Sequence, residues 1–582
     1  MTTEAEIRTE RVDDVPLLVW QQRAMGISQI IDEIIQPHGN RQGLSVGWTV
    51  VAWLSFIVSQ ADHRLSYVES WATEQIGTLQ ALFPAAVRVQ DFTDDRLGDV
   101  LSYLSDDASW TAIEAEVCQQ VMQVYELSPE RVHVDSTSAA LYHDPEGNPL
   151  VRYGKSKDHR PDLAQFKLML SSLAPMGMPL ATLIVPGNQA DDGLYLPVIE
   201  QTRQVLQRRG LLYIGDSKME ALSTRAGLQA GGDFYLVPLS KKGSQEQLLQ
   251  ELLEPLWTEE QVVTDIYLPE AQASEAPDKP KQRLRARAFA VERIQEVEDR
   301  SEPLEWTERI LVVYSPNLAD SARRGLAQRL QRAQDELLAL TPTPGRGRRQ
   351  WSELEPLQAA AEATVKGFRV SGLLTVTYER QESQRHVRKY KDRPARTETT
   401  VRYQVHVTPN PEAIELAQRE LGWRLYVTNT TAEQLSLEDA VSVYREAPLH
   451  EHNFSRLKNR PLGLRPFYVH RQDHMLGLVR LLSLALRLLT LVEFVVQREL
   501  QQQGTALTGL YEGNPNRSTD RPTTERLLRA FQPITLTSVN LPGQQIVHLT
   551  PLTPVQSQIL TLLGLPESIY TDLADVPNAI PP

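Results

Sequence analysis

Val132-His-Val-Asp135-Ser-Thr137 is a short, mostly β-branched run that ends at an aspartate followed by two turn-forming residues. A second run, Leu212-Tyr-Ile-Gly-Asp216, is largely aliphatic and also ends at an aspartate. Each pattern predicts the exit of a buried strand. A sheet that placed these two strands side by side would bring Asp135 and Asp216 to one edge.

A third acid, Glu451, lies in a polar segment with a helical pattern. Glu451, Phe454 and Lys458 fall on one face of that helix, so Phe454 can pack inward while Glu451 points at the aspartates. Three carboxylates that converge repel one another, and divalent cations make such a cluster tolerable. The sequence therefore predicts metal-dependent phosphoryl transfer.

Plainer interpretations of the same acids remain open. Taken singly, each aspartate also fits a turn or a helix cap, and Glu451 fits a solvated helix position. The histidines beside Glu451, His450 and His452, suggest zinc, but no third ligand stands at a familiar spacing. The joint pattern of three acids is what favours the metal site for phosphoryl transfer.

The chain has 582 residues, 41% of them hydrophobic and 23% charged, which predicts a folded protein of about three or four domains. Its net charge of −14 argues against a uniformly basic nucleic-acid binder, so any DNA contact must be made by local patches. A single cysteine, Cys118, excludes an internal disulfide.

The first residues lack the features of a secretory signal, and the apolar stretch Leu481 to Val496 carries Arg487 and Glu493. We therefore expect a cytoplasmic protein with a buried amphipathic helix and no membrane span.

Helical patterns over residues 1–128 predict an all-helical N-terminal domain that serves packing, dimerisation or the binding of DNA ends. Strands then alternate with helical stretches, which is the order of a mixed α/β sheet. The predicted strands are 131–135, 166–173, 180–185, 211–215, 234–239 and 425–429, with helices at 194–207 and 218–228. The predicted domains are 1–128, 129–240 for the first part of the core, 241–420 for an insertion, 421–503 for the second part of the core, and 504–582 for a Pro-rich tail.

The predicted insertion has strand-like stretches at 368–378 and 399–407 and is rich in basic residues. Its densest cluster consists of Arg385, Arg388, Lys389, Lys391, Arg393 and Arg396. In an acidic chain this cluster can bind DNA phosphates, although a solvated loop would have the same composition. Trp257, Trp306 and Trp351 could stack on an extruded base or pack in the core.

Several strings together resemble the DDE transposases of bacterial insertion sequences, specifically the IS-four-like superfamily with a β-strand insertion. They are Val134 to Thr137, Tyr153 to Leu163, Gly187 to Asp191, Gly215-Asp216, Thr428-Asn429, and Glu451 with Phe454 and Lys458. The resemblance covers residues from near 130 to near 500. It implies an α/β fold with an RNase H-like mixed-sheet core, interrupted by a β-rich inserted domain and preceded by an all-helical domain. The implied activity is cleavage of DNA at the ends of an insertion sequence and joining of the 3′ ends to target DNA.

That family has a signature of Tyr, two residues, Arg, three residues, Glu, six residues and Lys. Tyr444, Glu451 and Lys458 keep this spacing, but Ala447 stands where the signature has arginine. Arg445 is nearby and could take its place if Pro448 redirects the helix. The departure concerns the phosphate contact that the arginine normally makes.

The resemblance implies a role for each matching residue. Asp135, Asp216 and Glu451 would hold two Mg²⁺ ions, with Mn²⁺ as an alternative. The residues implied to contact DNA are Tyr444, Arg445, Lys458, Lys155, Lys157 and Arg160, beside the basic cluster of the insertion. The implied partners are double-stranded DNA, as terminal inverted repeats and target, and a second copy of the chain in a synaptic homodimer at the bacterial nucleoid. Two alternatives remain: a transposase-derived DNA-binding protein without catalysis, and an RNase H-like nuclease without strand transfer.

Overall fold

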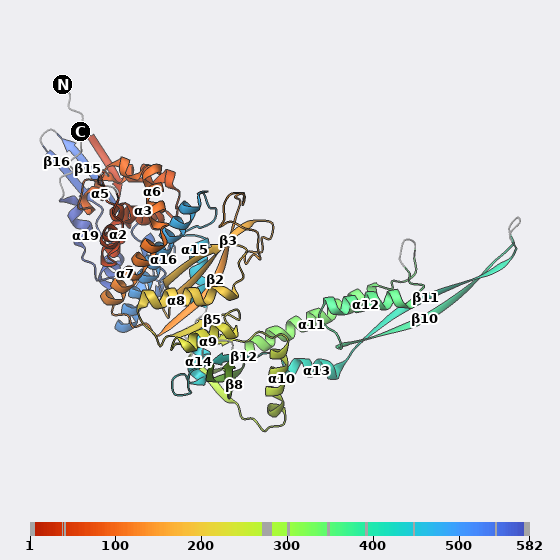
Figure 1. Cartoon of the computed structure of the whole chain (residues 1–582). Coiled ribbons are helices and arrows are strands. Elements are labelled where there is room, and N and C mark those ends of the chain that lie inside the picture. Colours follow the sequence, from red (N-terminus) through yellow and green to blue (C-terminus); the bar gives the residue numbers. More distant parts are fainter. Residues whose placement is uncertain are drawn as a thin grey trace. The chain divides into compact units, whose positions relative to one another are not determined.

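The structure is a computed structural model, and it describes residues 6–37, 39, 42–269, 282–298, 303–345, 350–389, 394–445, 448–541 and 544–575. Two compact units make up the chain (Figure 1). Unit 1 consists of Met1–Val237, Gln295–Trp306 and Val443–Pro582, and unit 2 of Pro238–Ile294 and Thr307–Ser442. All three acids singled out in the sequence belong to unit 1.

Helices form most of the first part of unit 1. They are α1 (Val15–Ala24), α2 (Ile27–Ile34), α3 (Val46–Gln60), α4 (Val68–Glu74), α5 (Ile76–Leu82), α6 (Asp94–Leu104) and α7 (Asp107–Val124). Side-chain caps fix the start of two of them: the Ser45 hydroxyl accepts from the Trp48 N–H at α3, and the Asp106 carboxylate accepts from the Ser109 N–H at α7. The predicted helical region is confirmed, and one strand, β1 (Glu6–Arg11), precedes it.

A five-stranded part of a mixed sheet forms the core of unit 1. Its strands are β2 (Arg131–Leu141), β3 (Ala164–Leu173), β4 (Met178–Pro186), β5 (Leu212–Gly215) and β6 (Phe234–Pro238), in the order β4-β3-β2-β5-β6. β2, β3 and β4 are antiparallel, whereas β2, β5 and β6 are parallel. The helices α8 (Tyr195–Leu206) and α9 (Leu222–Ala230) connect β4, β5 and β6. This arrangement confirms the predicted α/β fold class.

The helix α16 (Gln472–Gln503) is long and apolar enough to cross a membrane by length and composition, but its apolar part is almost entirely buried inside unit 1. It packs against β4, α3 and α6. The helix therefore serves as a core element, as predicted for residues 481–496.

An ion pair without solvent access lies in this core. The Arg487 guanidinium on α16 donates to the Glu114 carboxylate on α7 at 2.5 Å, and both side chains are 0% exposed. The same guanidinium donates to the carbonyls of Pro179 and Leu180 on β4 and to the Ser483 hydroxyl. One buried cation thus connects the helical region, the sheet and α16.

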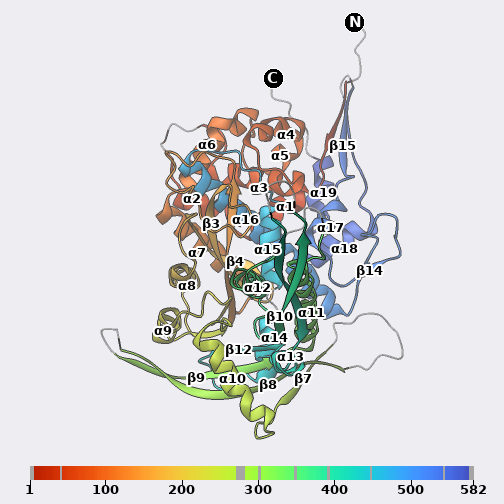
Figure 2. The same ribbon diagram turned by 90° about the vertical axis from the view of Figure 1, so that its right-hand side faces the viewer.

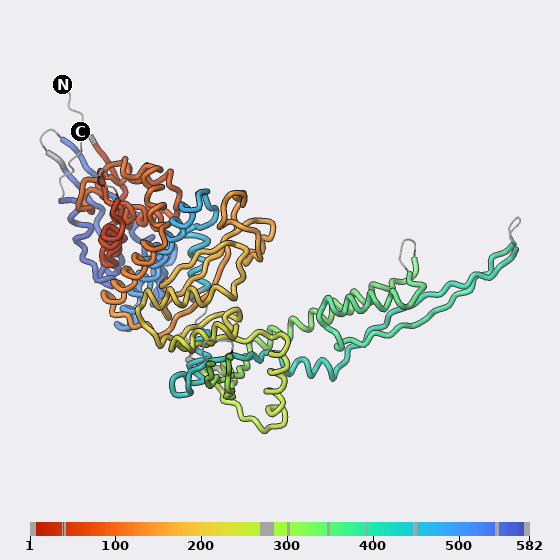
Figure 3. Tube along the Cα trace, in the orientation of Figure 1, coloured from red at the N-terminus to blue at the C-terminus, as the bar shows by residue number. Residues whose placement is uncertain are grey.

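The last part of the chain folds against the first. β15 (Thr535–Leu541) pairs with both β1 and β16 (Gln544–Leu549) in an antiparallel sheet of order β1-β15-β16. Figure 3 shows the blue last part of the chain beside the red first part. The helices α17 (Thr524–Arg529), α18 (Pro554–Leu562) and α19 (Ser568–Thr571) accompany it, with short strands β13 (Leu507–Thr508) and β14 (Ser518–Thr519). The sequence predicted only a Pro-rich tail beyond residue 504, and the pairing of β15 with the distant β1 leaves no local pattern.

Unit 2 contains both strands and helices. Its main elements are α10 (Ser244–Trp257), β7 (Thr264–Pro269), β8 (Gln282–Val297), β9 (Leu304–Tyr314), α11 (Pro316–Ala339), α12 (Leu354–Gly367), β10 (Leu374–Val387), β11 (Arg396–Pro409), α13 (Pro411–Arg419), β12 (Trp423–Thr428) and α14 (Leu437–Tyr444). β12 pairs with β9, and β7 pairs with β8. The predicted strand at 368–378 begins later, because α12 continues to Gly367.

β10 and β11 form a two-stranded antiparallel ribbon, which Figure 1 shows along its length and which lies at the β10 label in Figure 2. At its base Leu374 and Val405 pack into a cluster with Leu337 of α11 and Leu357 of α12. Further out, from Glu379 to His386, the β10 side chains are exposed. A ribbon with polar residues on both faces has no buried face to stabilise it, so its outer half is available to a partner.

Candidate active site

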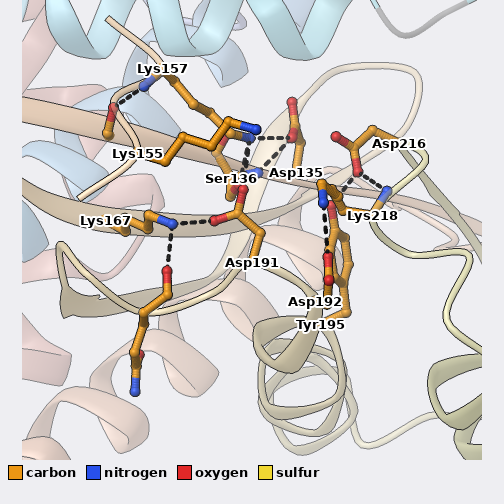
Figure 4. A network of polar contacts seen from close by, with 12 residues as sticks. Asp135, Ser136, Lys155, Lys157, Lys167, Asp191, Asp192, Tyr195, Asp216 and Lys218 are labelled. Carbon is orange, nitrogen blue, oxygen red and sulfur yellow. Dashed lines mark hydrogen bonds and ion pairs between the residues drawn. The ribbon is translucent and has the colours of Figure 1, made fainter. Parts of the chain in front are cut away.

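The two aspartates predicted to meet are brought together by the parallel pairing of β2 with β5. Val134 is opposite Gly215 in this pairing, and Asp135 and Asp216 are the next residues on the two chains. Their carboxylates lie side by side in Figure 4. Asp135 is not at the end of its strand, as the sequence suggested, because β2 continues along β3 to Leu141. Asp135 instead lies at the point along β2 where the parallel neighbouring strand, β5, ends.

Polar contacts fix the orientation of each carboxylate. The Oδ1 atom of Asp135 accepts from the backbone N–H of Ser136 at 2.6 Å. The Oδ1 atom of Asp216 accepts from the Tyr195 hydroxyl at 2.5 Å and from the backbone N–H of Lys218 at 2.8 Å. Burial and the Asp216 charge raise the pKa of Tyr195, so its hydroxyl keeps the proton that it donates. Both acids are therefore pre-oriented.

The two adjacent carboxylates concentrate negative charge, and this charge attracts cations. Burial raises the pKa of Asp135 to about 6, the neighbouring Asp216 carboxylate adds to the increase, and the Lys157 charge opposes it. The Asp135 side chain is 31% exposed, so an ion can reach it from solvent. Carboxylate oxygens are the ligands that Mg²⁺ prefers in proteins, and the donor set thus fits a divalent ion.

Two lysines and a further aspartate surround the pair. The Lys157 ammonium donates to the carbonyl and hydroxyl of Ser136 at 2.7 and 2.5 Å, and it lies 3.5 Å from Asp135 Oδ1 and 3.7 Å from Asp191 Oδ2. Asp191 also contacts Lys167, whose ammonium is 2.6 Å from its Oδ1 atom. Burial opposes ionisation of Asp191, but the Lys167 hydrogen bond and both lysine charges lower its pKa.

Asp191 and Tyr195 were not among the predicted site residues. Asp191 is part of the Gly187 to Asp191 string, which supported the resemblance without indicating a role. Tyr195 begins α8 within a helical pattern that looks like core packing, and the side chain is indeed 0% exposed. Its hydrogen bond to Asp216 becomes visible only in three dimensions.

The third predicted acid, Glu451, lies on helix α15 (Pro448–Lys458), which packs against β2 and α16. Phe454 and Asn453 are buried on this helix, and the Asn453 amide is hydrogen-bonded to the Gly177 carbonyl. Glu451 itself is exposed. Among the residues that the structure describes, no three His, Cys, Asp or Glu side chains form a group that could hold a metal ion. The structure thus joins two of the three predicted ligands, and the role of Glu451 remains a prediction.

Lys458 anchors α15 to the rest of unit 1. Its ammonium lies 2.7 Å from Asp158 Oδ1, and Arg465 lies 3.1 Å from Asp158 Oδ2. The Asp158 carboxylate also accepts from the Ala140 N–H at the end of β2. The Lys458 and Asp158 side chains are only 11% and 7% exposed. The lysine of the sequence signature is therefore engaged inside the protein in this structure.

Removing this anchor is expected to destabilise unit 1. Asp158→Asn would leave the Lys458 and Arg465 cations partly buried beside a neutral amide, which costs about 3 kcal/mol of unfolding free energy. Urea denaturation measures the loss. Asp162→Asn is the matched control on the same loop, since it breaks an exposed ion pair with Arg160 and should change stability little. Equal stability of the two variants would show that Asp158 does not hold α15.

The other predicted DNA contacts are distributed over both units. Arg160 forms an ion pair with Asp162 and lies over the Tyr142 ring, whereas Lys155, Arg385, Arg388, Lys389 and Arg445 are exposed. Arg396 pairs with Glu398, and Tyr444 is half-buried at the end of α14. Ala447, Lys391 and Arg393 lie outside the described residues.

Trp306 donates to the Tyr235 hydroxyl and Trp351 to the Leu340 carbonyl, so both are packing residues, whereas Trp257 is exposed.

Comparisons with known proteins find a family model whose matched range contains this site, and a similar solved structure. A family model described as "Transposase DDE domain" matches residues 126–488, a range that includes both aspartates, Lys157 and α15. No curated protein matches the sequence. Among solved structures, the chain is similar to a piggyBac transposase synaptic complex with hairpin DNA, determined by cryo-EM, at 8% identity and a TM-score of 0.34. That similarity covers 97% of this chain and 86% of the other.

Proposed function

This chain belongs to the transposase DDE domain family, whose members generally use divalent metal ions, and from this premise we propose that it cuts DNA at the ends of an insertion sequence and joins the 3′ ends to target DNA. The observation that carries the proposal is the pair of adjacent carboxylates, Asp135 and Asp216, on parallel strands β2 and β5. The resemblance to the IS-four-like superfamily supports a bacterial element and a substrate with terminal inverted repeats.

The proposed ligands of the ions are Asp135, Asp216 and Glu451. The Lys157 ammonium, which is surrounded by oxygens of Asp135 and Ser136, shows that the site already accommodates a positive charge. When bound, divalent ions would activate the attacking water or 3′-hydroxyl and stabilise the leaving oxygen. Magnesium fits the oxygen donors, and manganese is an alternative.

The residues of the chain would supply positioning and orientation. The Tyr195 hydroxyl and the Lys218 N–H hold Asp216 so that a carboxylate oxygen remains directed at its neighbour. The α15 anchor, made by Lys458 and Asp158, would keep the helix that bears Glu451 in register with β2. No covalent bond between protein and DNA is needed for an in-line displacement.

The experiment that tests this function uses linear DNA carrying the terminal repeats of the element. The purified protein is incubated with it in Mg²⁺ or EDTA, beside Asp216→Asn. We expect metal-dependent cleavage that the substitution removes while DNA binding persists. Cleavage in EDTA, or undiminished cleavage by the variant, would refute the assignment.

A second substrate distinguishes a transposase from the two alternatives. A pre-cut end with a free 3′-hydroxyl should be joined to target DNA by the wild-type protein. Cleavage without joining would identify an RNase H-like nuclease, and binding without either reaction would identify a transposase-derived DNA-binding protein. Because two ends must be held together for joining, we propose a homodimer on DNA, acting at the nucleoid in the cytoplasm.

DNA binding by the β10–β11 ribbon is testable on its own. Arg388→Glu with Lys389→Glu should weaken binding of duplex DNA at least about tenfold and lower the slope of log affinity against log salt by about 2, since each lost phosphate contact removes about 0.9. Fluorescence anisotropy at several salt concentrations measures both. Arg329→Glu with Lys366→Glu makes the same charge change at exposed positions on α11 and α12. If the two double variants behave alike, the ribbon effect is one of net charge only.

A further inference from the structure

We propose that Lys157 is the resident counter-ion of the aspartate pair, and that a divalent ion must displace its ammonium group to bind beside Asp135. This inference rests on the proposed function, because it concerns the same metal site. The counter-ion role was not indicated by the sequence, from which Lys157 was predicted only to contact DNA.

The surroundings of the ammonium are those of a bound cation. Four oxygen atoms from three residues lie within 3.7 Å of Lys157 Nζ: the carbonyl and hydroxyl of Ser136, Asp135 Oδ1 and Asp191 Oδ2. Figure 4 shows the side chain reaching into the space beside Asp135. An ammonium ion and a metal ion compete for the same carboxylate oxygen, because each needs its negative charge.

The backbone of Lys157 is held firmly although its side chain can move away. Its N–H donates to the Ser138 hydroxyl on β2 at 2.9 Å, and the carbonyl of the nearby Lys155 accepts from the Gln165 side chain on β3. The Lys157 side chain is nevertheless 32% exposed. Rotation about its flexible bonds would therefore release the ammonium toward solvent or a DNA phosphate without disturbing the sheet.

Lys167, the second lysine of the site, is held more rigidly than Lys157. Its side chain is only 6% exposed, and its ammonium is held by Asp191 Oδ1 and by the Gln189 carbonyl. Asp135 and Asp191 thus share the exchangeable ammonium of Lys157, and Asp191 also holds the fixed ammonium of Lys167. Lys167 keeps Asp191 neutralised, while loss of Lys157 leaves the Asp135 and Asp216 charges for a divalent ion.

The test measures Mn²⁺ binding by the full-length protein without DNA, using electron paramagnetic resonance of the free ion. Lys157→Met removes the charge and keeps the apolar part of the side chain, and should bind Mn²⁺ about tenfold tighter or more than the wild type. Lys157→Arg keeps the charge and should bind as weakly as the wild type. Lys366→Met, which removes an exposed lysine paired with Glu362, should leave affinity unchanged.

Two outcomes separate this inference from the proposed function. Unchanged or weaker Mn²⁺ binding by Lys157→Met would overturn the counter-ion role while leaving the metal site intact. If Asp135→Asn binds Mn²⁺ as the wild type does, the metal site itself is refuted. Lys157→Gln provides a second neutral variant should Lys157→Met fold poorly, and its affinity must rise in the same way. Circular dichroism in EDTA confirms that each variant is folded.

Discussion

Asp216→Asn is expected to lower the rate of DNA strand cleavage by about a thousandfold, which corresponds to about 4 kcal/mol of transition-state stabilisation. The amide keeps an oxygen that can accept from the Tyr195 hydroxyl and the Lys218 N–H, so the fold around it should survive. What disappears is the negative charge needed to hold a divalent ion beside Asp135. Single-turnover cleavage of an end-labelled duplex measures the effect.

The matched control for this substitution is Asp192→Asn. Asp192 is an exposed acid that pairs with Lys218 at 3.4 Å and belongs to the polar network of Figure 4. Its charge is therefore near the site but belongs to a solvent-screened pair, and we expect its loss to change the cleavage rate only a few fold. A comparable loss in both variants would mean that the general negative potential, and not ligation by Asp216, supports cleavage.

Arg487→Met is expected to have the largest effect on stability, lowering the free energy of unfolding by about 3–5 kcal/mol. The substitution leaves the Glu114 carboxylate in a place without water and removes donors from the carbonyls of Pro179 and Leu180. The effect should be visible in chemical denaturation followed by circular dichroism.

Two further variants show whether the loss comes from an unpaired buried charge. The double variant Arg487→Met with Glu114→Gln should be more stable than the sum of the single losses predicts, since neither charge is then left alone. Arg419→Met breaks an exposed pair with Glu415 one helical turn away and should cost only about 0.3–0.5 kcal/mol. Strict additivity of the buried substitutions would contradict this explanation.

The local patterns of the sequence predicted the elements that build the site. β-branched and aliphatic runs gave the positions of β2 and β5, and helical spacing gave the buried side of α15 that carries Phe454. Which strands are neighbours, and in which direction they run, was assumed from the idea that the two acids meet. In the structure, β2 and β5 are parallel neighbours, with Val134 opposite Gly215.

Features that depend on distant contacts could not be predicted in this way. Tyr195 looked like a core residue, and it is one, yet its single polar atom orients Asp216. The family resemblance implies that Lys458 contacts DNA, and no pattern in the sequence indicated that Asp158 lies within hydrogen-bonding distance of its ammonium. The sequence shows the spacing of Lys458 along its helix. It does not show the ion-pair partner of Lys458, because that partner, Asp158, is 300 residues away in the chain.

The pairing of β1 with β15 has a consequence for how the protein is made. Residues 6–11 are synthesised long before their partner strand at residues 535–541. At translation rates of about 5–20 residues per second, β1 waits roughly half a minute to two minutes for its neighbour. During that time its unpaired edge is open to other strands or to chaperones, and a product that stops before β15 never acquires the finished sheet.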